Sequence, residues 1–217
     1  MNSTGMDEPG LRQSLVEACR AMNALGINQG TSGNISVRHG GTMLISPSAT
    51  PYDAMGPNEV AAMPLGGEHW HGPLQPSTEW RFHRDILRAR REIGAVVHSH
   101  PTFCTTLAIA RRNIPACHYM VAAFGGTDVR CADYATFGTQ ELSDHALRAL
   151  EGRNACLLAN HGMIACGPTL ARAMWLAVEL EAIARQYYHS LLIGGPHLLS
   201  DAQIAETARK LSTYGAA

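Results

Sequence analysis

The chain has 217 residues, of which 46% are hydrophobic and 16% charged, a composition that builds one sizeable core and excludes an intrinsically disordered protein. Because a single core stops growing only at about 250–300 residues, we predict one domain over residues 1–217, with a loose head at residues 1–8. The formal net charge of -1 excludes a broad basic field that would attract nucleic acid or an anionic membrane.

Six segments carry the pattern of an amphipathic helix. In each of them apolar residues recur at three- and four-residue spacing, and a proline, a hydroxyl-bearing cap or a glycine marks an end. Ser77 or Thr78 is the predicted cap of the second helix, Thr139 of the fourth and Ser200 of the last. The predicted helices cover, in chain order, residues 9–25, 78–91, 101–110, 139–150, 176–191 and 200–214.

Shorter segments between these helices have the apolar or alternating character of strands. Residues 34–46 predict a β-hairpin, and Glu59–Met63, inside a segment rich in Gly and Pro, predicts an edge strand. Further strands are predicted at residues 94–97, 155–159 and 163–166. Since helices and strands interleave along the chain, we predict an α/β fold in which helices cover both faces of a sheet.

The cysteines and the N-terminal residues indicate where the protein resides. None of the six cysteines forms a Cys-x-x-Cys pair, and several stand in apolar runs, so we predict that they are reduced and buried. The chain begins without the basic and apolar regions of a secretory signal, and no stretch approaches about 18 uninterrupted apolar residues. We therefore predict a cytoplasmic protein.

Two His-x-His pairs differ in what precedes them. His69 and His71 lie in a segment flanked by Gly and Pro, and we interpret them as an exposed loop without a ligand. His98 and His100 follow the apolar strand at residues 94–97. Because residues i and i+2 of an extended chain project from the same side, both imidazoles can face one point, which is the geometry of a two-ligand metal arm.

His161 is a candidate for a third ligand. It also follows an apolar strand, and it precedes Gly162, where the backbone can come close to a neighbour. Three imidazoles would leave zinc an open position for substrate, and Glu79 would complete the set if it points toward the metal. The alternatives are that each histidine is a hydrogen-bonded residue near the core and that Glu79 only complements a helix dipole, and spacing does not decide between them.

Two further segments suit an anion. Ser77 and Thr78 offer hydroxyl groups and free backbone N–H groups at a helix N-terminus, which holds an anion without net positive charge. The segment 30–34, with its small residues, offers a second set of amide groups, although a glycine-rich turn by itself is usually only a turn.

Taken together, these motifs resemble the class II, zinc-dependent sugar-phosphate aldolases of the aldolase and adducin head fold, and within them the L-fuculose-1-phosphate aldolases. The resemblance runs from about Gly26 to Gly215. The segments that carry it are Gly33-Asn34, Ser77 to His83, Val96 to His100, Pro115 to Met120, Tyr134 to Thr139 and His161-Gly162.

The resemblance implies a fold and a metal centre. The fold is a single-domain, three-layer αβα sandwich with a largely antiparallel central sheet. The metal is one zinc ion per subunit, held by His98, His100 and His161, with Glu79 as fourth ligand in the resting site and as acid/base once substrate displaces it. The phosphate cradle that it implies consists of Gly33, Asn34, Ser48, Ala49, Ser77 and Thr78.

The resemblance also implies the aldehyde side of the site and the assembly. Tyr119, Phe137 and Tyr214 match family positions that line the aldehyde side, some of them from a neighbouring subunit, with Tyr119 as the catalytic proton donor. The family is typically a homotetramer with active sites between subunits. Two positions depart from the family pattern: Ala49 stands where Gly is more frequent, and its side chain disfavours positive φ, while Ser99 stands where Asn is frequent.

The activity implied is reversible, zinc-dependent aldol cleavage of a 1-phosphoketose, such as L-fuculose 1-phosphate, to dihydroxyacetone phosphate and a short aldehyde such as L-lactaldehyde. An aldolase for 5-methylthioribulose or 5-deoxyribulose 1-phosphate and a ribulose-phosphate 4-epimerase remain as alternatives within the fold. A non-catalytic interaction module like the adducin head is an alternative of another class, and the set of Glu79, His98, His100 and His161 argues against it.

Overall fold

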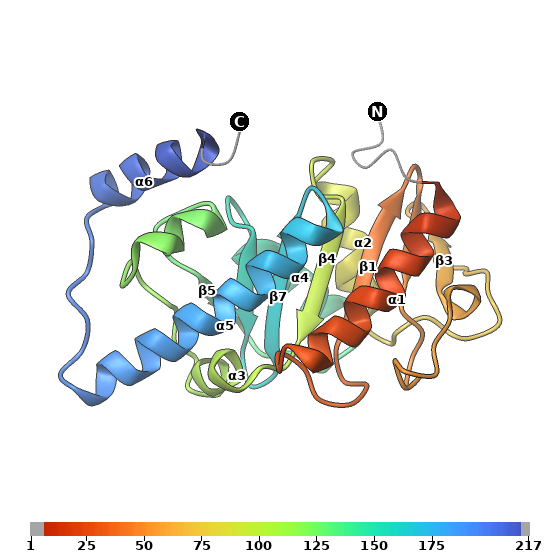
Figure 1. Cartoon of the computed structure of the whole chain (residues 1–217), viewed down its shortest axis with the longest axis horizontal. Coiled ribbons are helices and arrows are strands. Elements are labelled where there is room, and N and C mark those ends of the chain that lie inside the picture. Colours follow the sequence, from red (N-terminus) through yellow and green to blue (C-terminus); the bar gives the residue numbers. More distant parts are fainter. Residues whose placement is uncertain (1–6, 214–217) are drawn as a thin grey trace.

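A seven-stranded sheet forms the centre of the protein (Figure 1). The computed structural model describes residues 7–213. The strand order across the sheet is β3-β2-β1-β4-β7-β6-β5, and every neighbouring pair is antiparallel except β5 and β6. The strands are β1 (Asn34–His39), β2 (Thr42–Ile45), β3 (Ala61–Pro64), β4 (Ala95–Ser99), β5 (Arg130–Ala132), β6 (Ala155–Leu158) and β7 (Gly162–Gly167). The prediction of a largely antiparallel central sheet is therefore confirmed.

Helices cover both faces of this sheet, as predicted. Figure 1 shows α1 and α5 crossing one face, with α2 and α4 behind the sheet. Adjacent residues of β4 face opposite ways: Val97 belongs to the core beneath α1, α3 and α5, whereas Val96 belongs to the core beneath α2 and α4. The helices are α1 (Glu8–Ala24), α2 (Trp80–Ala89), α3 (Thr102–Ile109), α4 (Gln140–Ala149), α5 (Leu170–Leu192) and α6 (Asp201–Thr213). None of them has the length and apolar character required to cross a bilayer.

The predicted helix caps are confirmed in two places and wrong in one. Thr139 accepts a hydrogen bond from Leu142 N–H, and Ser200 accepts one from Gln203 N–H. The second helix, however, begins at Trp80 with Glu79 as its N-cap residue, because Ser77 forms a separate turn in which its carbonyl oxygen accepts the Trp80 N–H at 3.1 Å. The caps at Thr139 and Ser200 thus follow the local sequence, whereas the start of α2 depends on the loops around it.

The ends of the chain and one short strand also differ from expectation. Asp7 caps α1, which begins at Glu8, one residue before the predicted start, and the rest of the predicted loose head lies outside the described residues. No strand was predicted at β5, because its three residues, Arg130-Cys131-Ala132, are too few and too polar to show a strand pattern. Its parallel pairing with β6 decides its conformation. A 3-10 helix, η2 (Tyr119–Phe124), was also not predicted, and it packs against α6 through Ala122 and Ile204.

Candidate active site

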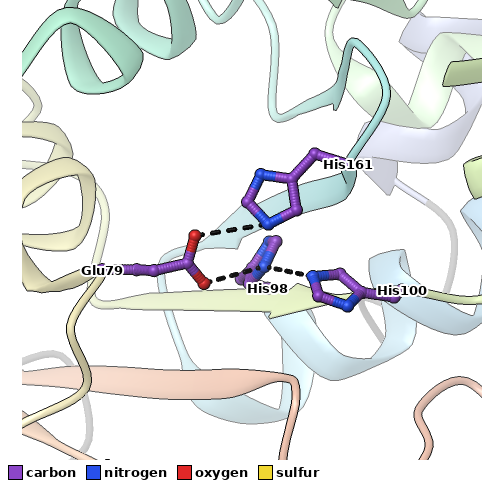
Figure 2. Close-up of side chains that lie close together, drawn as sticks. All are labelled: Glu79, His98, His100 and His161. Atoms are coloured by element: carbon purple, nitrogen blue, oxygen red, sulfur yellow. Dashed lines mark hydrogen bonds and ion pairs between the residues drawn. The ribbon is translucent and has the colours of Figure 1, made fainter. Parts of the chain in front are cut away.

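Four side chains from separate parts of the chain converge on one point (Figure 2). His98 is the last but one residue of β4, His100 follows that strand, His161 directly precedes β7, and Glu79 caps α2. Their ligand atoms all lie within 4.8 Å of one another. The strands β4 and β7 are antiparallel neighbours, so the end of one meets the start of the other. The sheet therefore unites the three histidines that the sequence motifs single out.

Gly162 is required for this convergence. A Cβ atom at this position would lie 2.5 Å from Cδ2 of His100 and 2.6 Å from the carbonyl oxygen of Ser99. Real Cβ atoms do not approach other atoms so closely, and any larger residue would displace His100 from the cluster. The close backbone approach predicted at Gly162 is confirmed.

Hydrogen bonds and burial set the state of the histidines. His98 Nδ1 lies 2.8 Å from the carbonyl oxygen of Met163, an acceptor, so Nδ1 carries a proton and Nε2 is the nitrogen that faces the cluster. Burial lowers the pKa of His100 to about 3 and that of His161 to about 4. Both rings are therefore neutral near pH 7, which is the form that binds a metal.

Glu79 is ionised although it is buried. Burial by itself would raise the pKa of Glu79, but its interactions with His98 and His161 and the hydrogen bond that Asn34 donates outweigh burial and hold the pKa well below its usual value. The carboxylate oxygen Oε2 lies 3.1 Å from His98 Nε2, and Oε1 lies 3.3 Å from His161 Nε2. The site thus combines one carboxylate with the neutral imidazoles of His100 and His161.

This donor set fits a divalent metal ion. Nε2 of His98 lies 2.9 Å from Nε2 of His100, and the two Glu79 contacts are 3.1 and 3.3 Å. Ligand atoms bonded tetrahedrally to zinc at about 2.0–2.1 Å would lie about 3.3 Å apart. Within residues 7–213, Oε1 of Glu79 is also buried without a hydrogen-bond donor, as expected of an atom that binds a cation. Imidazole nitrogen and carboxylate oxygen are both ligands of zinc.

Three loops named in the predicted phosphate cradle lie side by side next to the cluster. Ser46 N–H donates to the carbonyl oxygen of Ile35, next to Asn34, at 3.0 Å, and Ser77 N–H donates to the carbonyl oxygen of Ser46 at 3.0 Å. Ser48 N–H donates to the carbonyl oxygen of Gln75 at 2.9 Å. These bonds hold the segments around residues 34, 48 and 77 together.

The same bonds correct one part of the prediction. The backbone N–H of Ser77 is not free, because the carbonyl oxygen of Ser46 already accepts it. Ser77 Oγ accepts the N–H of Glu79 at 3.3 Å. Within the described part of the chain, the amides of Ala49 and Thr78 have no protein acceptor, so both remain available as backbone donors for an anion.

Ala49 adopts φ of +51°, the left-handed conformation that its side chain disfavours. We expect Ala49→Gly to raise the free energy of unfolding by up to about 1 kcal/mol, because relief of about 1–2 kcal/mol of strain exceeds the added chain entropy of glycine, about 0.5–1 kcal/mol. Urea unfolding measures this change. Ala21→Gly, inside the right-handed helix α1, should instead lower stability by about 0.5–1 kcal/mol. If Ala49→Gly lowers the free energy of unfolding as much as Ala21→Gly does, the backbone at Ala49 is not strained.

The aromatic residues expected on the aldehyde side are exposed on this chain. Tyr119 is 51% exposed and Phe137 is 62% exposed. Among the described residues, neither of them forms a hydrogen bond or ring contact with the four-residue cluster; the ring of Tyr119 packs on His118 instead. Phe137 does line a cavity of about 500 Å³ together with Thr78 and Arg81. Tyr214 lies outside the described residues.

Two residues near the site were not found by sequence reasoning. Glu181 of α5 accepts the N–H groups of Phe103 and Cys104, both at 2.8 Å, and so fixes the start of α3 just after His100. His83 lies fully buried against β1. His83 stands one helical turn after Glu79, so the i, i+4 spacing was a signal that it shares a face of α2 with the cluster. No spacing signal of this kind indicates Glu181, because it lies on α5, far along the chain from the start of α3.

The exposed pair His69 and His71 lies outside the cluster, as predicted. Their rings are 5.5 Å apart between centroids and contact each other in an edge-to-face arrangement. His71 holds its place through its backbone, which exchanges hydrogen bonds with Ala62. The difference between the two His-x-His pairs therefore comes from the rigid strand β4, which contains His98 and ends just before His100.

Comparison with known proteins assigns the chain to a family. Residues 13–188 match the family described as Class II Aldolase and Adducin N-terminal domain. A 5-methylthioribulose-1-phosphate/5-deoxyribulose-1-phosphate aldolase of Rhodospirillum rubrum is 52% identical over 205 residues, 94% of this chain and 92% of that protein. The L-fuculose phosphate aldolase of Escherichia coli K12 is 46% identical over 211 residues, 97% and 98% of the two chains.

A solved structure agrees with these relatives. An L-fuculose 1-phosphate aldolase superposes with a TM-score of 0.91 at 36% identity, covering 94% of this chain and 96% of that one. The family match over residues 13–188 contains all seven strands of the sheet and the four residues of the cluster. The chain therefore belongs to the class II aldolase and adducin N-terminal domain family, as one of its aldolases.

Proposed function

We propose that this protein catalyses reversible, zinc-dependent aldol cleavage of a 1-phosphoketose to dihydroxyacetone phosphate and a short aldehyde. The observation that carries the proposal is the convergence of Glu79, His98, His100 and His161 beside three loops rich in hydroxyl and amide donors. An adducin-like module without catalysis would have no need of that donor set. Free cysteines throughout the chain support a cytoplasmic location.

Two substrates have support. L-fuculose 1-phosphate, which would yield L-lactaldehyde, is favoured by the named activity of the 46% identical relative. 5-Methylthioribulose 1-phosphate or 5-deoxyribulose 1-phosphate is favoured by the name of the 52% identical relative. Both classes share the phosphorylated three-carbon half and differ in the aldehyde, so the residues on the aldehyde side decide between them.

The cluster supplies the chemistry of the carbon–carbon bond. A zinc ion held by the three histidines would act as a Lewis acid that stabilises the negative charge of the enediolate. Glu79 is the acid/base: in condensation its carboxylate removes a proton from the hydroxymethyl carbon of dihydroxyacetone phosphate, and in cleavage it takes up a proton from water and transfers it to that carbon.

Tyr119 is the proposed partner of Glu79 on the aldehyde side. In cleavage its phenolic oxygen takes the proton of the hydroxyl group at the carbon that becomes the aldehyde and passes its own O–H proton to water, while the electrons of the breaking bond pass to the enediolate. In condensation it returns that proton to the aldehyde oxygen. Phe137 and Tyr214 are proposed to line the aldehyde.

The phosphate is proposed to lie among the three loops beside the cluster. The hydroxyl groups of Ser48, Ser77 and Thr78 and the amides of Ala49 and Thr78 are available donors there, and none of them carries a charge. Gly33 and Asn34 complete the proposed set. Because none of these donors is charged, the phosphate dianion would be held by several short hydrogen bonds. The chain, with a net charge of -1, offers no broad basic surface that would hold it instead.

The exposed aromatic residues support an assembly in which subunits share sites. Tyr119 and Phe137 are more than half exposed on the single chain, although they are proposed to line a substrate. We therefore propose a homotetramer with active sites at subunit interfaces, in which a neighbouring subunit covers these side chains.

A screen of phosphorylated ketoses tests the function. The purified protein is incubated with L-fuculose 1-phosphate, 5-methylthioribulose 1-phosphate, 5-deoxyribulose 1-phosphate and L-ribulose 5-phosphate, and dihydroxyacetone phosphate is measured by a coupled dehydrogenase. We expect at least one 1-phosphoketose to release it at a rate that chelator treatment abolishes. Epimerisation of L-ribulose 5-phosphate without any release of dihydroxyacetone phosphate would instead support the epimerase, and the absence of both reactions would contradict an enzyme of this kind.

A further inference from the structure

A chain of buried side chains leads from β1 to the carboxylate of Glu79. His83 Nδ1 lies 2.8 Å from Ser36 Oγ, and His83 Nε2 lies 2.5 Å from Asn34 Oδ1. Asn34 Nδ2 in turn lies 3.1 Å from Oε2 of Glu79. All four residues are buried, with His83 and Ser36 fully inaccessible to solvent. Ser36, His83 and Asn34 thus form a hydrogen-bonded series that ends on the proposed acid/base.

The fold accounts for this arrangement. Asn34 and Ser36 are two residues apart on β1 and so share the face of the sheet that α2 covers, while Ile35 and Val37 point into the other core. Within α2, His83 follows Glu79 by four residues, so both side chains are on one face of the helix. Strand and helix periodicity therefore place the two pairs against each other.

The direction of every hydrogen bond in the series follows from Glu79. An ionised carboxylate only accepts hydrogen bonds, so Asn34 must turn its Nδ2 toward Glu79 and its Oδ1 toward His83. Oδ1 only accepts, so His83 Nε2 must carry a proton. A neutral imidazole has one N–H, so Nδ1 is bare and accepts the hydroxyl proton of Ser36.

Burial keeps His83 in this neutral state. Removal from water is the main cause that lowers the pKa of His83 to about 3, with repulsion from His98 adding to it and attraction to Glu79 opposing it. In the other tautomer, Nε2 would accept a hydrogen bond. Asn34 would then reverse its amide and place Oδ1 against the Glu79 carboxylate, where two acceptors repel each other.

We propose that His83 is a positioning residue: its Nε2–H holds the amide of Asn34 in the one orientation that donates to Glu79, and so fixes the carboxylate for proton transfer. The inference rests on the proposed function, in which Glu79 is the acid/base. It also gives Asn34 a task besides the phosphate, since one of its two amide hydrogens is committed to Glu79.

Two substitutions at His83 separate positioning from packing. His83→Gln keeps an N–H donor near the place of Nε2, whereas His83→Leu fills the space without a donor. We expect H83Q to retain kcat within about threefold, and H83L to lose about 10–100-fold in kcat with KM changed less than about threefold, the range for residues that orient a site through a neighbour. A packing role alone would make Leu at least as well tolerated as Gln, and equal kcat values for the two variants would overturn the proposal.

Nitrogen-15 NMR of histidine-labelled protein gives a readout that does not depend on turnover. After metal removal we expect the His83 ring to carry its proton on Nε2 with Nδ1 bare, its signals being assigned by their loss in H83Q. A proton on Nδ1 alone, or on both nitrogens, would overturn the proposal. If H83L does not fold, this measurement decides. If the unsubstituted protein lacks aldolase activity, the proposed function fails, while the tautomer still reports whether Asn34 is oriented as inferred.

Discussion

We expect the His98→Ala variant to lose the metal and, with it, at least about 100-fold of the aldol cleavage rate, which is the upper end of the loss for residues that only orient a ligand. His98 is fully buried, and its Nδ1–H is anchored on the carbonyl oxygen of Met163 at 2.8 Å, so its Nε2 is held at the centre of the cluster. Neither His100 nor His161 can take that place, because both approach the cluster from other directions (Figure 2). Zinc content per chain, measured by plasma mass spectrometry on protein purified without chelator, gives the result.

The control for this variant is His71→Ala. His71 belongs to a His-x-His pair of the same spacing, but it is exposed and lies outside the cluster. We expect H71A to keep the zinc content and activity of the unsubstituted protein. A zinc content in H98A equal to that of H71A would show that the ligand assignment is wrong.

The second large effect is expected for Glu79→Gln, which should lower kcat about 10²–10⁴-fold, the range for loss of a general acid/base. Glutamine has the shape of glutamate and still accepts a hydrogen bond from Asn34, but at neutral pH it neither takes nor gives a proton. We expect KM to change by less than about tenfold, because the proposed phosphate contacts lie on other residues, and zinc to remain bound through the three histidines. Steady-state kinetics and zinc content of the same preparation distinguish loss of chemistry from loss of metal.

Glu17→Gln is the matched control for that substitution. Glu17 is exposed on α1, where its carboxylate accepts a hydrogen bond from Gln13 Nε2 at 2.7 Å, and it lies outside the cluster. Since an exposed side-chain hydrogen bond contributes little, E17Q should be as active as the unsubstituted protein. Activity of E79Q close to that of E17Q would remove Glu79 from its proposed role.

Much of the local structure could be predicted from short stretches of sequence. The hairpin at residues 34–46, the caps at Thr139 and Ser200 and the strand that precedes His98 are all present in the fold. Each depends on residues within a few positions of one another, through period-two alternation, helical spacing or a hydroxyl next to a helix start. The projection of His98 and His100 from the same side of the chain could also be predicted, because the two residues are only two positions apart.

The tertiary structure alone decided how these parts meet. The position of β7 beside β4, which brings His161 to His98, and the parallel pairing of β5 are contacts between distant strands, and the capping of α3 by Glu181 links two helices. Likewise, the turn at Ser77 that moves the start of α2 to Trp80 depends on a bond to Ser46.

The amino-acid sequence by itself thus determined most of the helices and strands, the family and the four candidate ligands of this protein. Only the folded chain decided that Asn34 and His83 support Glu79, that the Ser77 amide is unavailable and that Ala49 is left-handed. The physical reason is the separation along the chain of the residues that interact. Backbone periodicity and capping act between neighbours in the chain, whereas hydrogen bonds between buried side chains depend on which distant segments packing brings together.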